Sequence, residues 1–139
     1  MKLLFICKYN AFRSRISEEY FNKINKNSRI EVISRGLIMG ARPGKAHLKI
    51  SRELLGINIT KRKPLPLTLD NLINSDIIVV SANDIPKIIF NHTQIKNKKI
   101  IFWKIKDEQS GNEKNIKHIV LSIKKKVDSL NKQLSIVKK

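Results

Sequence analysis

Four short apolar runs divide the chain, and polar residues barely interrupt them. They occupy residues 3–6, 31–34, 76–80 and 99–103. Short runs that are rich in β-branched and aromatic residues are typical of strands buried on both faces of a parallel sheet. The pattern therefore predicts four strands that lie inside the molecule rather than at its surface.

Amphipathic stretches lie between these runs. Apolar residues recur every three or four positions within residues 14–26, 45–55 and 116–134, which predicts helices, and shorter helical pieces are expected at 69–73 and 85–90. Strands and helices thus alternate along the chain, which is typical of an α/β fold with helices on both faces of a parallel sheet. No linker is long enough to divide the chain, so we expect a single domain over residues 1–139.

The chain is strongly basic. It has 29 Lys and Arg residues against 11 Asp and Glu residues, which gives a formal net charge of +18. Such an excess raises the hypothesis of a nucleic-acid or other polyanion partner. A generally basic surface without a dedicated polyanion site also explains it, and we favour that interpretation.

A single cysteine, Cys7, narrows the chemistry further. One thiol cannot form an internal disulfide or a Cys-based zinc cluster, and we expect neither a metal nor a cofactor. The apolar runs fall far short of the roughly 18 residues of a membrane span, and the first run is too short for a signal peptide. We therefore expect a cytoplasmic protein, with no membrane partner, in a compartment where a lone thiol stays reduced.

The loop after the first predicted strand carries the candidate chemistry, because ligands bind parallel sheets at the carboxyl ends of the strands. It opens with Cys7 and closes with Arg13 and Ser14 at the start of the first predicted helix. A strand, a short loop and a helix N-terminus form an anion cradle of backbone N–H groups, to which an Arg adds a two-pronged phosphate clamp. The residues between them, which we expect to bind substrate, are Lys8, Tyr9, Asn10, Ala11 and Phe12.

These residue types predict nucleophilic catalysis on phosphorus. The N–H donors, the helix dipole and Arg13 favour the thiolate form of Cys7, which is the reactive form. The same groups would hold a phosphate in front of the sulfur, so that attack gives a phosphocysteine and water then releases inorganic phosphate. Ser14 either donates a hydrogen bond to the thiolate or caps the helix, and both roles are open.

The Cys-x5-Arg-Ser segment resembles the signature of the low-molecular-weight protein tyrosine phosphatases, a family that includes one class of arsenate reductases. The similarity extends to Ser34-Arg35-Gly36, Leu55-Gly56-Ile57 and Ser75-Asp76-Ile77. The resemblance implies a three-layer α/β/α fold with a four-stranded parallel sheet in the order 2-1-3-4. It also implies roles for four loop residues: the nucleophile Cys7, the phosphate clamp Arg13, the thiolate partner Ser14 and the loop-shaping Asn10.

Hydrolysis of a phosphate ester also needs a proton donor for the leaving oxygen. The family places an Asp after the fourth strand, so the resemblance implies Asp107 as the general acid. Glu108 stands where the family usually has proline and is an alternative acid, and the aromatic pair of eukaryotic members is missing beyond it. Asp84, after the third predicted strand, is a further candidate, although we favour a helix-capping role for it.

Two loop residues depart from the family pattern. Tyr9 replaces a glycine, so we expect it to strain the loop or to form a wall of the pocket. Phe12 stands where the family often has a second cysteine, which protects the nucleophile by forming a disulfide with it. Without that partner, we expect oxidation of Cys7 to give a sulfenic acid or a higher oxide. For His47, in the long loop after the second predicted strand, we expect a surface or structural role.

The sequence thus predicts a metal-independent phosphatase of the protein-tyrosine-phosphatase type, acting on a phosphorylated protein or a small phosphomonoester. One alternative is a catalytically weak or inactive basic protein that binds phosphate or a polyanion, and nucleic acid is a less favoured partner. Another is an arsenate-reductase-like protein, which would need an external thiol because the chain has one cysteine. A phosphocysteine carrier of sugar transport is disfavoured, since such a carrier needs no Arg clamp.

Overall fold

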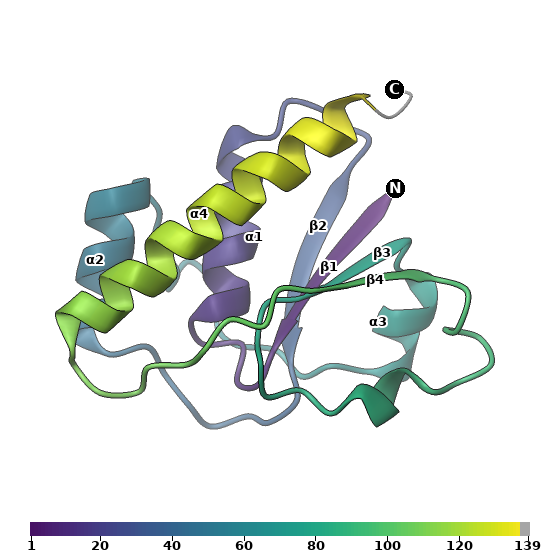
Figure 1. Ribbon diagram of the computed structural model, residues 1–139, viewed down its shortest axis with the longest axis horizontal. Helices are drawn as coiled ribbons and strands as arrows, with labels where there is room; N and C mark the ends of the chain where they lie inside the picture. Colours follow the sequence, from purple (N-terminus) through teal and green to yellow (C-terminus); the bar gives the residue numbers. More distant parts are fainter. Residues whose placement is uncertain (137–139) are drawn as a thin grey trace.

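Four parallel strands form the centre of the computed structural model, which describes residues 1–136 (Figure 1). The strands are β1 (Lys2–Cys7), β2 (Glu31–Gly36), β3 (Ile77–Val80) and β4 (Lys99–Phe102). They pair in the order β2-β1-β3-β4, and every neighbouring pair is parallel. The predicted fold class and strand order are therefore confirmed.

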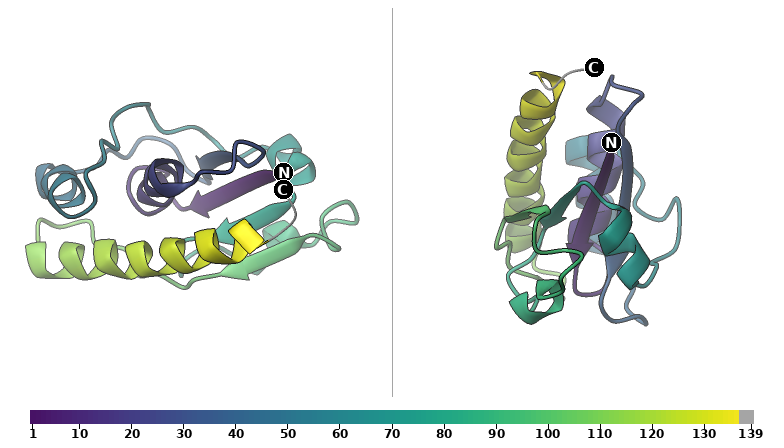
Figure 2. Two further views of the ribbon diagram at one scale, coloured as in Figure 1. Left: turned by 90° about the horizontal axis from the view of Figure 1, so that it is seen from above. Right: turned by 90° about the vertical axis from the view of Figure 1, so that its right-hand side faces the viewer.

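Helices cover both faces of the sheet and produce three layers. One face carries α1 (Arg13–Ile24), α2 (Lys45–Leu55) and α4 (Glu113–Ile136), and the other carries α3 (Leu69–Asn74) and the short 3-10 helix η1 (Lys87–Phe90). The right-hand view of Figure 2 shows α4 and α3 on opposite sides of the strands. In the part of the chain that the structure describes, no helix combines the length and the apolar character needed to cross a membrane.

Alternate side chains of β1 pack into two separate hydrophobic cores, one on each face of the sheet. Leu3 and Phe5 pack into the core beneath α1, α2 and α4, while Leu4 and Ile6 pack into the core beneath α3. All four side chains are fully buried, and burial of each contributes about 1.5–3 kcal/mol relative to exposure. Because β1 is held from both faces, the position of Cys7 at its end is fixed.

Several predicted elements differ from those in the structure in kind or in bounds; the last helix, for example, begins at Glu113 rather than at residue 116. The sequence predicts a helical piece over residues 85–90, but the structure has only the four-residue turn of η1. Pro86 explains the difference, because a proline forces the residue before it into extended backbone and delays the start of a helix. The first helix begins at Arg13 rather than at residue 14 and ends at Ile24, two residues before the predicted end.

All four strands point toward the same edge of the sheet (Figure 1). Cys7 pairs in register with Gly36, the last residue of β2. On the other side, β3 and β4 end together at the pair Val80 and Phe102. The loops that leave these four ends therefore meet at one edge, which is where a parallel sheet places its ligands.

Candidate active site

Asn10 shapes the loop between β1 and α1. It adopts the left-handed conformation with φ = 55° and is fully buried. Its Oδ1 accepts hydrogen bonds from Arg62 Nη1 at 3.2 Å and from the Leu65 backbone N–H at 3.0 Å. Both partners are donors only, so the orientation of the amide is fixed, and its Nδ2 donates to Ser14 Oγ at 2.7 Å and to Ser34 Oγ at 2.9 Å.

This orientation directs the hydroxyl proton of Ser14. Ser14 Oγ accepts from Asn10 and lies 3.0 Å from the Cys7 sulfur; a thiolate can only accept, so the Ser14 hydroxyl donates to the sulfur when Cys7 is ionised. The Asn10 backbone N–H also donates to this sulfur at 3.3 Å. The N-cap of α1 is Phe12, so Ser14 does not cap the helix. Two donors therefore converge on a sulfur that can carry negative charge.

A buried ion cluster lies beneath the loop. Ser34 Oγ donates to Glu18 Oε1 at 2.6 Å, and the same oxygen receives Arg62 Nη2 at 2.6 Å and Arg15 Nη1 at 2.7 Å. Arg15 and Glu18 lie on α1 and are buried, so each charge needs the other to offset the cost of leaving water. No local pattern in the sequence predicts this cluster, because Arg62 lies 44 positions from Glu18.

Gly36 allows the loop to pack directly on the end of β2. A Cβ atom at this position would lie 2.6 Å from the backbone nitrogen of Asn10 and 2.7 Å from the backbone carbon of Tyr9. Both distances are too short for a real contact, so any side chain would push the loop off the strand. The glycine of the Ser34-Arg35-Gly36 segment is thus explained by close approach of two backbones.

The side chain of Arg13 is 1% exposed, and its guanidinium is held by two partners. Its Nη1 donates to the Ile105 carbonyl at 2.9 Å and lies 3.1 Å from Asp84 Oδ1, while its Nη2 donates to Asp84 Oδ2 at 3.2 Å. These contacts occupy the tip of the guanidinium. The side edge formed by Nε and Nη2 stays available, and this edge fits two oxygens of one phosphate.

The two candidate aspartates lie at different sides of Arg13. Asp84 binds the tip of the guanidinium, and the helix-capping role favoured from the sequence is wrong, since η1 has Pro86 as its N-cap and no side-chain cap. Asp107 Oδ1 lies 3.8 Å from Arg13 Nε, and Asp107 lines the same cleft as Cys7. Asp107 is therefore the aspartate beside the phosphate-binding edge of Arg13.

Glu108 is held by its own neighbours. Its carboxylate accepts hydrogen bonds from the hydroxyl and the backbone N–H of Ser110, and from Asn115 Nδ2 at 2.7 Å. The hydrogen bonds from Ser110 and then Asn115 lower the pKa of Glu108 below its usual 4.5. The Glu108 carboxylate is thus engaged by Ser110 and Asn115, whereas Asp107 Oδ1 lies 3.8 Å from Arg13 Nε, so Asp107 is the better placed candidate acid.

His47 forms part of the cleft wall and has a structural role. Its ring meets the Phe12 ring edge-on with centroids 4.6 Å apart, and its Nε2 is 2.5 Å from the Glu108 carbonyl oxygen. A carbonyl only accepts, so this contact places the proton on Nε2. The buried Nδ1 has no hydrogen-bond partner within residues 1–136. His47 thereby connects α2 to the loop that carries Asp107.

The cleft has a volume of about 490 Å³, within the range of pockets that bind small ligands. Of the residues expected to bind substrate, Tyr9, Ala11 and Phe12 line it, whereas Lys8 and Asn10 do not. Lys8 instead lies with its Nζ 5.3 Å from the centre of the Tyr9 ring. Among the described residues, no backbone hydrogen bond uses the N–H of Tyr9, Ala11 or Phe12 as donor, so these groups are available to an anion.

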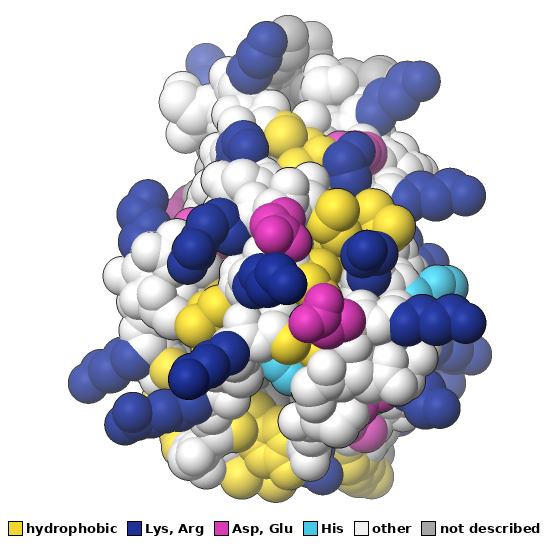
Figure 3. All heavy atoms as spheres, turned by 90° about the vertical axis from the view of Figure 1, so that its left-hand side faces the viewer, with side chains coloured by type: hydrophobic (Ala, Val, Ile, Leu, Met, Phe, Trp, Pro, Cys, Tyr) yellow, Lys and Arg dark blue, Asp and Glu magenta, His cyan; other side chains and the backbone are white. Residues whose placement is uncertain are grey.

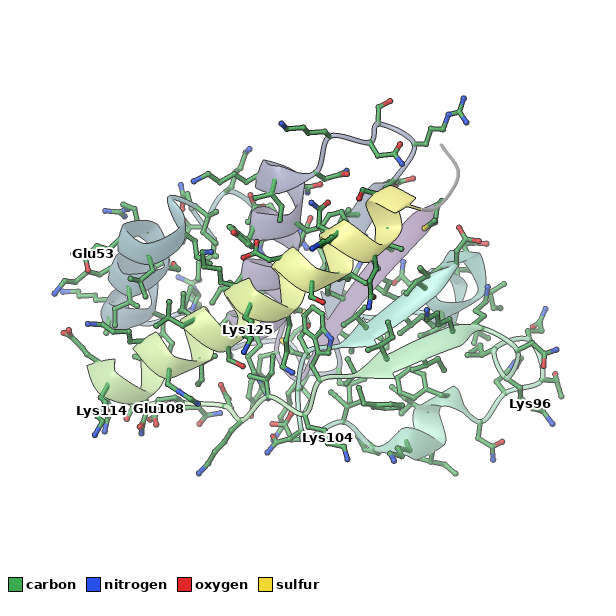
Figure 4. The ribbon with its side chains drawn as sticks, turned by 45° about the horizontal axis from the view of Figure 1, so that its top comes forward. Glu53, Lys96, Lys104, Glu108, Lys114 and Lys125 are labelled. Atoms are coloured by element: carbon green, nitrogen blue, oxygen red, sulfur yellow. The ribbon has the colours of Figure 1, made fainter. Side chains whose placement is uncertain are left out.

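The far wall of the cleft comes from residues 39–44 in the loop between β2 and α2, and from residues 107–109. Figure 4 shows Lys104 and Glu108 in the loop between β4 and α4, at the edge where the strands end. The site thus draws on three loops that are far apart in the sequence. The sequence predicted a nucleophile, a clamp and the candidate acids Asp107 and Glu108, but it did not place residues 39–44 in the cleft.

Comparison with known proteins identifies the family. The family model described as low molecular weight phosphotyrosine protein phosphatase matches residues 2–138. No curated protein matches the chain.

Solved structures share the fold at low sequence identity. A low molecular weight protein tyrosine phosphatase from T. tengcongensis has 19% identity and a TM-score of 0.82, covering 96% of this chain and 99% of that chain. The YwlE arginine phosphatase from Geobacillus stearothermophilus has 17% identity and a TM-score of 0.81, covering 97% and 93%. A thioredoxin-dependent arsenate reductase from Corynebacterium glutamicum has 25% identity and a TM-score of 0.73, covering 99% and 63%.

Proposed function

Because the chain belongs to the low-molecular-weight phosphotyrosine protein phosphatase family, we propose that it hydrolyses phosphomonoesters through a phosphocysteine formed on Cys7. The observation that supports this most directly is the position of the Cys7 sulfur. It accepts hydrogen bonds from Ser14 and Asn10, and it shares one cleft with Arg13 and Asp107. A nucleophile, a phosphate clamp and a proton donor are therefore close together.

In the first step, the Cys7 thiolate attacks phosphorus while the bond from phosphorus to the leaving oxygen breaks. The carboxylic acid of Asp107 gives its proton to that oxygen, so the product leaves as a neutral alcohol or phenol. The negative charge on the transferring oxygens is met by the loop N–H groups and by the Nε–Nη2 edge of Arg13. The step leaves a phosphocysteine and an ionised Asp107.

In the second step, water attacks the phosphocysteine. The Asp107 carboxylate takes a proton from this water, the phosphorus–sulfur bond breaks, and inorganic phosphate leaves. The electrons of the broken bond return to sulfur, where the Ser14 hydroxyl stabilises the thiolate by a hydrogen bond. Each group ends the cycle in the protonation state in which it began, without a metal or a cofactor.

The substrate in this proposal is a phosphorylated protein or a small phosphomonoester. Arsenate reduction is less favoured, because the chain has one cysteine and the oxidised nucleophile would need an external thiol to restore it. A lone thiol at the nucleophile position also suits a reducing compartment, so we propose that the protein acts in the cytoplasm.

Turnover of p-nitrophenyl phosphate tests the proposal. Wild-type protein is expected to release nitrophenol, and Cys7→Ser is expected to fall to the background rate because the nucleophile is lost. Asp107→Asn is expected to lower kcat by less than the roughly 10²–10⁴-fold of a full general-acid contribution, because nitrophenolate is an acidic leaving group that needs little protonation. Wild-type turnover no faster than that of Cys7→Ser would exclude the phosphatase and favour a protein that only binds phosphate.

Asp107 is tested separately from the nucleophile. Its loss is expected to slow alkyl phosphates, whose leaving groups need a proton, more than aryl phosphates with acidic leaving groups. Equal slowing of the alkyl and the aryl phosphates would indicate that another residue is the general acid, and Asp84 would be tested first.

A further inference from the structure

A second groove runs beside the catalytic cleft. It has a volume of about 720 Å³ and shares Ala11 and residues 39–43 with the cleft, so the two lie side by side with a common wall. We call it the side groove. Its lining is Asn10, Ala11, Met39, Gly40, Ala41, Arg42, Pro43, Ile59, Thr60, Arg62, Lys63, Pro64, Leu65 and Pro66.

The charged side chains that line the side groove are all cationic. They are Arg42, Arg62 and Lys63, and no Asp or Glu is among the lining residues. Arg62 is neutralised by Glu18. Arg42 and Lys63 are exposed, and within residues 1–136 neither lies within 4 Å of a carboxylate oxygen. The side groove therefore presents two positive charges that the described part of the chain does not balance.

Apart from Asn10 and Thr60, the rest of the side groove is lined by glycine and apolar residues, and none of its lining residues is aromatic. Its walls come mainly from Met39, Pro43, Ile59 and Leu65, with two further prolines. Nucleic-acid grooves bind bases by stacking on aromatic side chains, and the side groove has none. Aliphatic walls with isolated cations suit a polypeptide segment instead, because they take up its aliphatic groups and pair with its carboxylates.

We propose that the side groove binds the polypeptide segment next to a phosphorylated residue, with a preference for acidic side chains in that segment. The proposal rests on the proposed phosphatase function, since the phosphorylated residue would occupy the cleft. Because the cleft and the side groove share Ala11 and residues 39–43 as a wall, a peptide bound in the cleft has its neighbouring residues beside the side groove. Figure 3 shows the side of the molecule where α2 and the start of α4 lie in Figure 1, and Lys and Arg side chains outnumber Asp and Glu side chains there too, so the basic charge extends beyond the side groove.

Two phosphotyrosyl peptides test this preference. One carries Asp and Glu on both sides of the phosphotyrosine, and the other carries Ala at the same positions. We expect kcat/KM to be about 3- to 10-fold higher for the acidic peptide at low salt, the effect of one or two partly exposed ion pairs. The ratio is expected to approach 1 at about 1 M salt, where the screening length falls to about 3 Å.

A matched pair of variants locates the effect. Lys63→Glu and Lys125→Glu each change the net charge by the same amount, but Lys63 lines the side groove whereas Lys125 lies on the exposed face of α4 (Figure 4). Lys63→Glu is expected to abolish or reverse the ratio between the two peptides. Lys125→Glu is expected to keep the wild-type ratio. An equal drop in both variants would mean that overall charge, not the side groove, sets the preference.

The result for p-nitrophenyl phosphate separates failure of this inference from failure of the proposed function. Turnover of p-nitrophenyl phosphate with equal kcat/KM for the two peptides would overturn the side groove as a binding site. If p-nitrophenyl phosphate is not turned over, the proposed function fails. Fluorescence anisotropy of the labelled peptides then tests, without catalysis, whether the side groove binds the acidic peptide. Tighter binding of the acidic peptide that Lys63→Glu weakens and Lys125→Glu preserves would still support the side groove, and equal binding would overturn it.

A single-stranded oligonucleotide serves as the competitor in the same binding assay. Displacement of the acidic peptide by a stoichiometric amount of oligonucleotide, lost in Lys63→Glu, would assign the side groove to nucleic acid instead. We expect no such displacement at physiological salt.

Discussion

Arg13 and Asp84 form a two-point ion pair across 71 positions of sequence, with Nη1 3.1 Å from Oδ1 and Nη2 3.2 Å from Oδ2. This contact turns the guanidinium so that its tip faces Asp84 and its Nε–Nη2 edge faces Asp107. In the proposed mechanism, Asp84 orients the clamp and Asp107 moves the proton. The two carboxylates can therefore be distinguished by experiment.

Replacement of Asp84 by Asn is expected to lower kcat/KM about 10- to 100-fold, because a clamp displaced by about 1 Å loses transition-state contacts. Inhibition by inorganic phosphate should weaken in parallel, since the same edge of Arg13 binds it. The dependence of rate on the leaving group should stay as in the wild type, which separates Asp84→Asn from Asp107→Asn. A steeper dependence in Asp84→Asn would give the proton-donor role to Asp84.

Ser14→Ala removes the hydroxyl that points to the Cys7 sulfur. Hydrogen bonds to charged groups contribute about 1.5–3 kcal/mol, so kcat is expected to fall about 10- to 100-fold. Alkylation of Cys7 by iodoacetamide at pH 7 should slow as well, because the sulfur loses the hydroxyl contact of Ser14. Ser17→Ala is the matched control, since this buried serine on α1 bonds to the Arg13 carbonyl and to Ser81 rather than to sulfur. Wild-type alkylation in Ser14→Ala would contradict the assigned contact.

Glu108→Gln is expected to retain most of the phosphatase activity and to change the pH dependence of stability. The hydrogen bonds from Ser110 and Asn115 lower the pKa of Glu108 in the folded protein. The resulting stabilisation is present above the unfolded-state pKa and is lost as the pH falls through the lower folded-state pKa. The Tm difference between wild type and Glu108→Gln should therefore be largest near pH 7 and shrink below about pH 4.5. A constant difference from pH 7 to pH 3 would contradict this.

Arg62→Ala removes the donors to Asn10, Ser34 and Glu18 at once. Because the Arg62 side chain is 26% exposed, we expect a loss of about 2 kcal/mol in the free energy of unfolding, below the 3–5 kcal/mol of a fully buried pair. Phosphate inhibition should also weaken, since Asn10 loses a partner that fixes the loop. Arg62→Lys should restore only part of the stability and only part of the phosphate inhibition, because an ammonium group cannot reproduce the paired donors of a guanidinium.

Lys61→Ala is the control for Arg62→Ala. Lys61 is the preceding residue and its side chain is exposed, so the variant should unfold like the wild type. Urea unfolding of the three variants measures the comparison. Equal stability of Arg62→Ala and wild type would show that the buried cluster does not depend on Arg62.

Local patterns in the sequence were sufficient to predict most of the fold. The continuous apolar runs predicted β1 and β3, and the bounds of α2 match the prediction residue for residue. Periodicity fails where a single residue overrides it, as Pro86 does before η1. Spacing alone also placed Cys7, Arg13 and Ser14 at a strand end and a helix start, because a short loop brings its own ends together.

Contacts between distant segments could not be predicted in the same way. The partners of Asn10 at Arg62 and Leu65 lie 52 and 55 positions away. Asp84 resembled a helix cap because a short polar residue before a helical stretch usually is one, and only the folded sheet brings it to Arg13. Sequence periodicity specifies which residues are buried, but it does not specify which buried polar groups meet.

The distribution of the site along the chain has a consequence for folding. The proposed nucleophile, Cys7, lies at the end of a central strand that pairs with both β2 and β3, while Asp107 follows the last strand of the sheet. No contiguous fragment shorter than residues 7–107 contains both groups, and strand pairing of high contact order must precede their meeting. Regain of turnover after dilution from denaturant would therefore report completion of the whole sheet, later than the recovery of helical signal from α1 and α4.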